Sequence, residues 1–411
     1  MISGERTLGI LCLLMAAGLL FVGLWPFDPS PKNKAYWLPD EEGLHFDGQD
    51  RRLKLSVGGI AYTPSPLKSS ESPRSEKGSF TIEIVLRPAV EVSSGVPYIV
   101  GFSDDSGNEA FYLGQRKQSL ILRWYTPDQS RKRWMKEIGV RDALIKDKTQ
   151  QLTLVSNRTT CSIHLNGELA KSFQDVALID EKESIRGLSV TLGNSRSVKG
   201  PWTGTVQALK LYERALSETE IAANREGTTG TDSREGLIAA FEMDEGHNTS
   251  VPDLSGNKNT LVVPERVTLT NSILAWPDYR NQKDSSPAGD IVVNILGFMP
   301  FGFLIAFWRE QVNGSRRWSS LLLAIAIGAL TSLVIEVTQA FIPARDSNMA
   351  DLICNTGGTV IGVGLLEFIE FVGLLGGWEL IAHSKKAESK RTQEETITKT
   401  PHWKNRNKGP G

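Results

Sequence analysis

The stretch Asp290-Ile-Val-Val-Asn-Ile-Leu-Gly-Phe-Met-Pro-Phe-Gly-Phe303 opens the first of three long apolar runs toward the C-terminus. These runs, at about 291–308, 319–342 and 351–375, can each cross a bilayer core, because a core of about 30 Å takes roughly 20 residues of helix. A fourth apolar run, within residues 1–25, stands at the N-terminus. The pattern predicts a helical membrane bundle of four spans.

Each of the three C-terminal runs carries polar side chains close to one end. An ionisable group near the bilayer centre costs roughly 3 kcal/mol, so such groups normally face a bundle interior, a wet cavity or the interface. Their spacing places them all toward one side of the membrane, where the loop 343–350 adds an arginine. The predicted polar membrane cluster consists of Asp290, Asn294, Glu336, Gln339, Arg345, Asp351 and Asn355.

Two interpretations of this polar membrane cluster are open. Amide and charged side chains can bind helices together within a bilayer, at roughly 0.6 kcal/mol per hydrogen bond. The seven polar residues exceed what helix packing needs, so they are also a candidate site for a lipid head group or a glycan-linked lipid.

Positive charges predict the orientation of the spans. Arg309, Arg316 and Arg317 lie between the second and third spans, and the C-terminal tail 381–411 is basic. The positive-inside rule places both in the cytoplasm. We expect both termini to be cytoplasmic and the region between the first two spans to be extracytoplasmic. The first span should be a retained anchor rather than a cleaved signal peptide, because further apolar sequence follows its small residues.

Residues 40–276 have the pattern of an all-β domain, between linkers at 26–39 and 277–289. Asn166-Gly167 is a strong hairpin signal, because both residues tolerate positive φ, and Ser217-Glu-Thr-Glu220 is typical of a capping box that opens a helix over 218–224. Short runs with alternating or β-branched residues predict strands. These runs are Phe80 to Leu86, Tyr98 to Phe102, Ala110 to Leu113, Leu120 to Tyr125, Gln151 to Val155, Cys161 to Leu165, Leu188 to Leu192 and Thr203 to Tyr212.

Four segments of this domain resemble the concanavalin A-like lectin/glucanase jelly roll of the laminin-G type. They are Gly78 to Arg87, Leu152 to Ser156, His164 to Glu168 and Trp202 to Ile221. The resemblance implies a jelly-roll β-sandwich that binds carbohydrate. The segment 236–257 resembles the family's opening strand although it stands at the end, which either a permuted closure or a truncated second copy would explain.

Glucanases of this fold carry two catalytic glutamates in a Glu-x-Asp-x-x-Glu pattern. The nearest match here is Glu242-Met-Asp-Glu-Gly-His247, where His247 replaces the second glutamate. Because retaining glycosidases need two carboxyl groups about 5 Å apart, we expect a binding domain rather than an enzyme.

Candidate ligand-binding residues in the ectodomain are few. Tyr112, Trp124 and Trp134 are candidates for stacking on sugar, although each could instead be buried in the sandwich. Asp104 and Asp105 could hold calcium through hard oxygen ligands, although a solvated turn would also explain them. No other cofactor is expected.

The C-terminal region resembles the VanZ-like family over residues 290–380. The resemblance rests on Asp290 to Phe303, Glu336 to Arg345 and Asn348 to Gly358, in that order. The family is named for a protein associated with low-level resistance to the glycopeptide teicoplanin. Its recurrent polar positions fall on the seven residues of the polar membrane cluster. Ser347-Asn348 departs from the family, in which a second aspartate is common there.

Other function classes find no support in the sequence. It contains no phosphate-binding loop, nucleotide fingerprint, zinc spacing or nucleophile elbow, and the formal net charge of −1 gives no sign of nucleic-acid binding. We expect an integral membrane protein of the cell envelope that contacts membrane lipid and an envelope glycan or peptidoglycan precursor, and that affects glycopeptide susceptibility. The alternative is an intramembrane enzyme or transporter acting on an anionic lipid-linked substrate.

Overall fold

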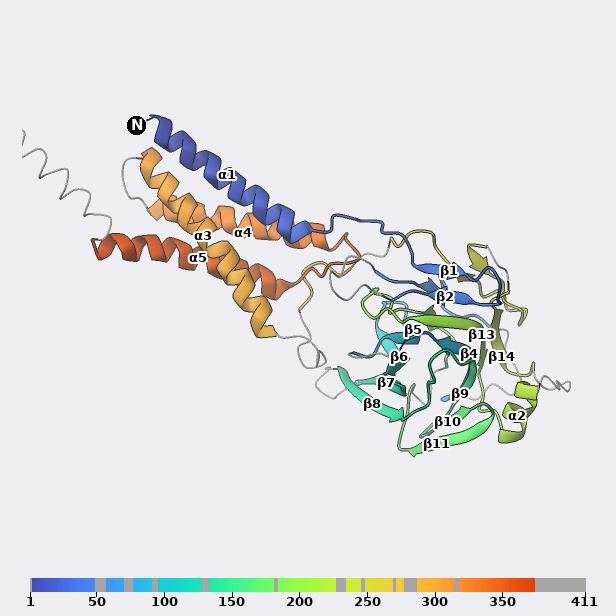
Figure 1. Cartoon of the computed structure of the whole chain (residues 1–411). Coiled ribbons are helices and arrows are strands. Elements are labelled where there is room, and N and C mark those ends of the chain that lie inside the picture. The colour runs from blue at the N-terminus through green and yellow to red at the C-terminus, as the bar shows by residue number, and fades with distance from the viewer. Residues whose placement is uncertain are drawn as a thin grey trace, which may run out of the picture. The chain divides into compact units, whose positions relative to one another are not determined.

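The computed structural model describes residues 2–48, 57–69, 77–90, 95–127, 133–180, 184–226, 234–244, 248–268, 271–276, 287–313 and 318–373 (Figure 1). The chain divides into two compact units. The helical unit comprises residues 1–22, 288–334 and 350–411, and the sandwich unit comprises residues 23–287 together with 335–349. The basic tail 381–411 lies outside the described residues.

Two antiparallel sheets form the sandwich (Figure 1). The first sheet has the order β1 (Ala35–Trp37), β2 (Leu44–Phe46), β13 (Gly204–Tyr212), β4 (Ser79–Pro88), β9 (Gln150–Asn157), β10 (Thr160–Leu165) and β11 (Glu168–Gln174), with β14 (Leu237–Glu242) also paired to β13. The second has the order β15 (Ser250–Val251), β16 (Leu261–Val262), β3 (Ala61–Tyr62), β12 (Ser189–Leu192), β5 (Tyr98–Ser103), β6 (Glu109–Arg116), β7 (Ser119–Pro127) and β8 (Arg133–Val140).

Alternation along the strands decides which side chains fill the space between the sheets. In β4, Phe80, Ile82, Ile84 and Leu86 are fully buried in the core, whereas Thr81 and Glu83 lie at the alternate positions. All eight predicted strands are present. Asn166 and Gly167 both have positive φ, at 50° and 86°, in the turn that joins β10 and β11, so the predicted hairpin is also confirmed.

Two segments share one long partner strand. Gly204 to Val206 of β13 pair with β2, whereas Ala208 to Tyr212 of the same strand pair with β14. The segment that resembles the family's opening strand therefore completes this sandwich instead of starting a second one. The structured part also begins earlier than 40, because β1 and the buried Asn33 lie within the expected linker 26–39.

Four helices of the described chain are long and apolar enough to span a membrane: α1 (Ile2–Leu24), α3 (Pro287–Asn313), α4 (Trp318–Gln339) and α5 (Met349–Phe371). Their ends differ from the predicted ones. Helix α4 stops at Gln339 rather than 342, because a residue that precedes proline disfavours the helical conformation and Pro343 follows. Helix α5 ends before Gly373, whose φ of 75° is typical of a helix C-cap.

Glycines bring α3 and α5 of the helical unit into backbone contact. A Cβ atom added to Gly362 would lie 1.9 Å from the carbonyl oxygen of Met299, and one added to Gly358 would lie 2.4 Å from that of Ile295. Gly302 of α3 approaches α5 in the same way, 2.2 Å from the carbonyl oxygen of Thr359. Small residues at this spacing permit close helix packing.

We expect Gly362→Ala to lower the melting temperature of the detergent-solubilised protein, because overpacking costs about 1 to 3 kcal/mol and the atom opposed here is backbone. Gly364→Ala is the matched control, since no atom lies within 4 Å of its added Cβ. The control should be neutral or stabilising, because alanine favours helix over glycine. Equal melting temperatures for the two variants would contradict this packing.

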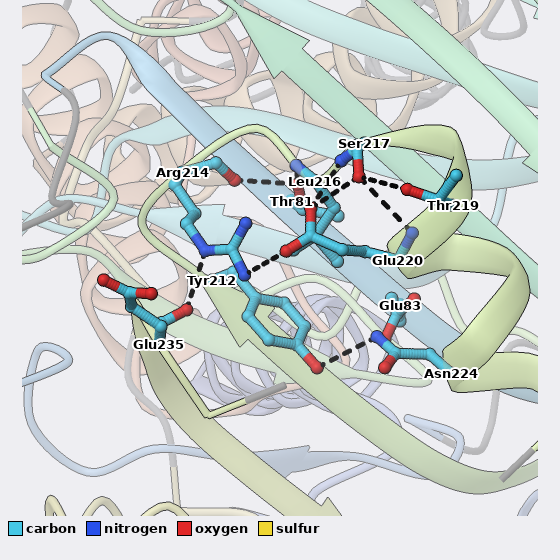
Figure 2. A network of polar contacts seen from close by, with 10 residues as sticks. All are labelled: Thr81, Glu83, Tyr212, Arg214, Leu216, Ser217, Thr219, Glu220, Asn224 and Glu235. Atoms are coloured by element: carbon cyan, nitrogen blue, oxygen red, sulfur yellow. Dashed lines mark hydrogen bonds and ion pairs between the residues drawn. The ribbon is translucent and has the colours of Figure 1, made fainter. Parts of the chain in front are cut away.

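The short helix α2 (Glu218–Glu226) is fixed to the sandwich by the polar network in Figure 2. The Ser217 amide donates to Glu220 Oε2 at 2.8 Å and the Glu220 amide donates to Ser217 Oγ at 3.4 Å, so the predicted capping box is confirmed. Arg214 forms an ion pair with Glu220 at 2.7 Å. Hydrogen bonding from Arg214, supported by Ser217, lowers the pKa of Glu220 to about 2.

This network predicts a pH-dependent loss of stability. The folded pKa of Glu220 lies below the unfolded value of about 4.3, so its contribution is present above that value and is lost as pH falls toward 2. Glu220→Gln should therefore lower the melting temperature at pH 7 by a few degrees, for a loss of about 1 to 2 kcal/mol. The difference from the wild type should shrink between pH 5 and pH 2. Glu226→Gln, at the other end of α2 and outside this network, is the matched control and should leave the melting temperature at pH 7 unchanged.

Candidate functional site

Two hydrogen bonds made by residues of the predicted polar membrane cluster join helices of the helical unit. Asn294 Nδ2 of α3 donates to Asp351 Oδ1 of α5 at 2.8 Å. Asn355 Nδ2 of α5 donates to Ser332 Oγ of α4 at 2.9 Å, and both of these side chains are buried. Such bonds fit the interpretation of these residues as polar contacts that hold helices together.

One polar atom of this contact has no hydrogen-bond partner within the described chain. Asn355 is 4% exposed, and its Oδ1 atom is buried without a partner. Asp290, by contrast, is exposed at the start of α3. Four of the seven predicted cluster residues thus belong to the helical unit, and the structure directly bonds two of them, Asn294 and Asp351.

The remaining three cluster residues belong to the sandwich unit. Glu336 is 2% exposed, and its Oε2 atom accepts a hydrogen bond from the amide of Asn348 at 2.7 Å. Gln339 Nε2 donates to the carbonyl oxygen of Gly23 at 2.6 Å. The backbone of Arg345 lies in the loop between α4 and α5, where its carbonyl oxygen accepts from Asn271 Nδ2 at 2.6 Å. A single cluster of all seven residues stays a prediction.

The aromatic candidates in the sandwich are placed differently from one another. Trp124 is 4% exposed and packs in the core, so its ring cannot stack on a sugar. Trp124 faces inward because side chains alternate along a strand, and Leu122 and Leu120, two and four residues earlier in β7, face the same core. Tyr112 is 2% exposed and its ring stacks on that of Tyr98, with centroids 3.7 Å apart. Trp134 lies in β8, and its side chain is outside the described part of the structure.

The carboxylate of Asp104 is used by its own turn. It accepts hydrogen bonds from the amide of Asn108 at 2.8 Å and from Asn108 Nδ2 at 3.0 Å. Among the described residues, no group of three or more His, Cys, Asp or Glu side chains is placed to hold a metal ion. Calcium binding by Asp104 and Asp105 remains a prediction.

The described candidate glucanase residues, Glu242 and Asp244, lie at and just beyond the C-terminal end of β14. Glu242 and Asp244 are both exposed, whereas Met243 between them is buried in the core. His247 lies outside the described residues. The expectation that this motif is not catalytic therefore stays an expectation.

The outer face of the second sheet carries a network that the sequence analysis did not identify. Arg123 Nη1 donates to the Tyr112 hydroxyl at 2.9 Å, and Arg123 Nε donates to Glu137 Oε2 at 2.7 Å. Arg116 binds both carboxylate oxygens of Glu137, at 2.6 and 2.9 Å. Burial raises the pKa of Glu137, but these arginines outweigh burial and hold the pKa below its usual range. The network fixes the Arg116 guanidinium on the sheet.

A groove of about 610 Å³ lies beside this network. Residues of β6, β7 and β8 line it together with Lys171 of β11, and β8 and β11 are edge strands of the two sheets. Its lining consists of Arg116, Ser119, Ile121, Gly139, Val140, Arg141 and Lys171.

The charge of the groove is positive. Among the described residues, its lining contains three cationic side chains and no acidic or aromatic one. Arg116 shares Glu137 with Arg123, whereas no ion pair with a carboxylate is found for Arg141 or Lys171 in the described chain. Lys171 lies over the ring of Phe173, 4.9 Å from its centroid. Arg141 and Lys171 are exposed, so a bound anion could reach both.

Comparison with protein families identifies two regions of the chain. Residues 64–222 match the concanavalin A-like lectin/glucanases superfamily, and residues 241–370 match the VanZ/LLP1 family. Both resemblances seen in the sequence are thereby confirmed, and the chain combines a lectin-like sandwich with a VanZ-type membrane region. No protein of curated function matches the chain.

Several solved structures are similar to part of the chain. A candidate carbohydrate binding protein from Bacteroides ovatus is 13% identical, with a TM-score of 0.36, and the match covers 54% of this chain and 58% of that one. The receptor binding domain of botulinum neurotoxin D is also 13% identical, with a TM-score of 0.34 and coverage of 49% and 46%. A heptameric SAP-like pentraxin from Limulus polyphemus is 12% identical, with a TM-score of 0.33 and coverage of 51% and 96%.

Proposed function

We propose that this membrane protein binds an anionic glycan of the cell envelope in the groove between β8 and β11. The observation that carries the proposal is the set of three cations, Arg116, Arg141 and Lys171, around one open groove. Arginine and lysine bind phosphate and carboxylate groups, and arginine can do so with two parallel hydrogen bonds.

The shape and lining of the groove favour a polymer chain. The groove is open and is bordered by edge strands of both sheets, so a ligand longer than the groove can extend past its ends. Gly139 lets Ile121 approach the backbone of β8, since a Cβ atom added there would lie 2.9 Å from Ile121 Cδ1. Because the described lining residues include no aromatic ring, binding rests on charge and hydrogen bonds rather than on stacking.

The proposal includes the side of the membrane on which the sandwich lies. Positive charges after α3 and in the tail favour cytoplasmic termini and an extracytoplasmic sandwich. The loop between α4 and α5 contacts the sandwich within one unit, as expected for two segments on the same side. In this arrangement the VanZ/LLP1 region lies beneath the envelope polymers, where an effect on glycopeptide susceptibility would arise through a glycan or a lipid-linked precursor.

Replacing the two unpaired cations tests the groove. Full-length Arg141→Ala/Lys171→Ala in nanodiscs should lose at least ten-fold in affinity for an anionic envelope polymer, because two charge contacts are removed. The probes are a phosphodiester polymer such as teichoic acid, a carboxylate-bearing glycan and neutral dextran, titrated by light scattering or calorimetry. Wild-type binding to the anionic polymers should weaken as salt rises.

The matched control is Lys68→Ala/Lys77→Ala, which removes two exposed lysines that do not line the groove. It should bind like the wild type. Equal losses in both double variants would indicate attraction by overall charge. Equal binding of the neutral and the charged polymers would contradict the proposed ligand class.

Cysteine labelling tests the orientation. In a background without Cys12, Cys161 and Cys354, a cysteine placed at Lys77 or Phe341 in intact cells should react with a membrane-impermeant maleimide. One placed at Gly314 or Ser389 should react only after the membrane is permeabilised. Lys77 lies in the sandwich and is exposed, so a failure of labelling at this position cannot be attributed to burial. The opposite pattern would place the sandwich in the cytoplasm.

A further inference from the structure

Within the sandwich unit, a segment that follows the sandwich strands runs alongside the loop between α4 and α5. The segment is 271–275, and the loop extends from Ala340 to Asn348. The Asn271 amide donates to the Ala340 carbonyl oxygen at 2.9 Å, and the Leu274 amide donates to Ser347 Oγ at 2.9 Å. These contacts join parts of the chain that are more than 60 residues apart.

The two segments also form one rung of parallel sheet. Ala275 pairs with Asn348: the Ala275 amide donates to the Ser347 carbonyl oxygen at 3.2 Å, and the Met349 amide donates to the Ala275 carbonyl oxygen at 3.0 Å. In a parallel rung of this kind, the amide of the middle residue points away from the partner strand. The Asn348 amide therefore does not bond to Ala275 and is directed elsewhere.

That amide is bound to the carboxylate of Glu336. The distance from Asn348 N to Glu336 Oε2 is 2.7 Å, and the Glu336 side chain is 2% exposed. A buried carboxylate requires hydrogen bonds from fixed donors, because moving it out of water costs several kcal/mol. The rung with Ala275 supplies such a fixed donor.

Side-chain contacts hold the middle of the same loop. Asn271 Nδ2 donates to the Arg345 carbonyl oxygen at 2.6 Å. Ala344 packs against a small apolar cluster formed by Val57, Ile60, Val198 and Val267. The ammonium group of Lys199 forms an ion pair with Asp346. The loop is thus attached to the sandwich by hydrogen bonds, apolar contact and charge.

We infer that the segment 271–275 is a clamp that positions Glu336 by fixing the Asn348 amide. Both halves of the clamp and Glu336 itself lie within residues 241–370, the range that matches the VanZ/LLP1 family. The hydrogen bonds of the clamp attach the polar end of α4 and the following loop to the sandwich, and residues 335–349 accordingly belong to the sandwich unit. The clamp does not depend on glycan binding in the groove, and it acts on Glu336 through backbone that the sandwich holds.

The test compares two asparagines of the full-length protein in detergent, the half-buried Asn271 and the buried Asn259. Asn271→Ala removes the side chain that bridges to Arg345. Asn259→Ala is the matched control, because Asn259 Nδ2 also bridges two carbonyl oxygens, those of Lys68 and Ile238, away from the loop. Amide hydrogen exchange should show at least ten-fold faster exchange over 340–349 in Asn271→Ala, and exchange like that of the wild type in Asn259→Ala. Equal protection of this loop in both variants would overturn the clamp.

A double-mutant cycle separates positioning from mere loop stabilisation. If the clamp positions the donor for Glu336, the effect of Glu336→Gln on the melting temperature should be smaller in the Asn271→Ala background than in the wild type. In the Asn259→Ala background its effect should be unchanged. Ser347→Ala is a milder variant that removes only the acceptor for the Leu274 amide. If Asn271→Ala does not fold, the cycle can be run with Ser347→Ala, for which we expect the same non-additivity. Additive effects for both clamp variants would reject the positioning role.

Discussion

The placement of polar side chains in this protein follows from the cost of burying a hydrogen-bonding group without a partner, which is of the order of several kcal/mol in apolar surroundings. The buried carboxylate of Glu336 accepts a hydrogen bond from the Asn348 amide. Asn355 donates through Nδ2 to Ser332, whereas its Oδ1 atom has no partner within the described chain. Glu83 in the sandwich shows the same cost outside the membrane region. Burial raises its pKa, although hydrogen bonding to Asn224, drawn in Figure 2, partly offsets this effect. In each case the partner comes from another segment, so these polar residues tie distant parts of the chain together.

Local sequence was sufficient for features that depend on neighbours along the chain. The alternation of Phe80, Ile82 and Ile84 predicted both the strand and its inward face. The Asn166-Gly167 turn and the Ser217–Glu220 capping box were predicted because each needs only a few consecutive residues of defined chemistry. The four long helices followed from length and hydropathy, and only their ends shifted where a proline or a positive-φ glycine terminates the helix.

The groove could not be predicted in this way. Arg116, Arg141 and Lys171 come from different strands of two sheets, and only the sandwich topology brings them to one place. Trp124 shows a signal that was present but not used. It has the parity of Leu120 and Leu122, which indicates an inward ring, whereas Arg123 has the parity of the outer face. The alternation along β7 thus predicts a buried Trp124 and an outward-facing Arg123, which makes the arginines of the outer face better candidates for ligand contact than the tryptophan.

The two interpretations of the polar membrane residues fit different residues of the predicted cluster. Asn294, Asp351 and Asn355 make helix-to-helix hydrogen bonds, which is the behaviour of residues that hold a bundle together. Glu336 instead takes its donor from a loop that the sandwich unit holds, and Arg345 lies in that loop. A residue that only joined helices would not need a donor fixed by a segment outside the bundle. The part of the cluster most suited to a role beyond packing is therefore the end of α4 and the loop after it.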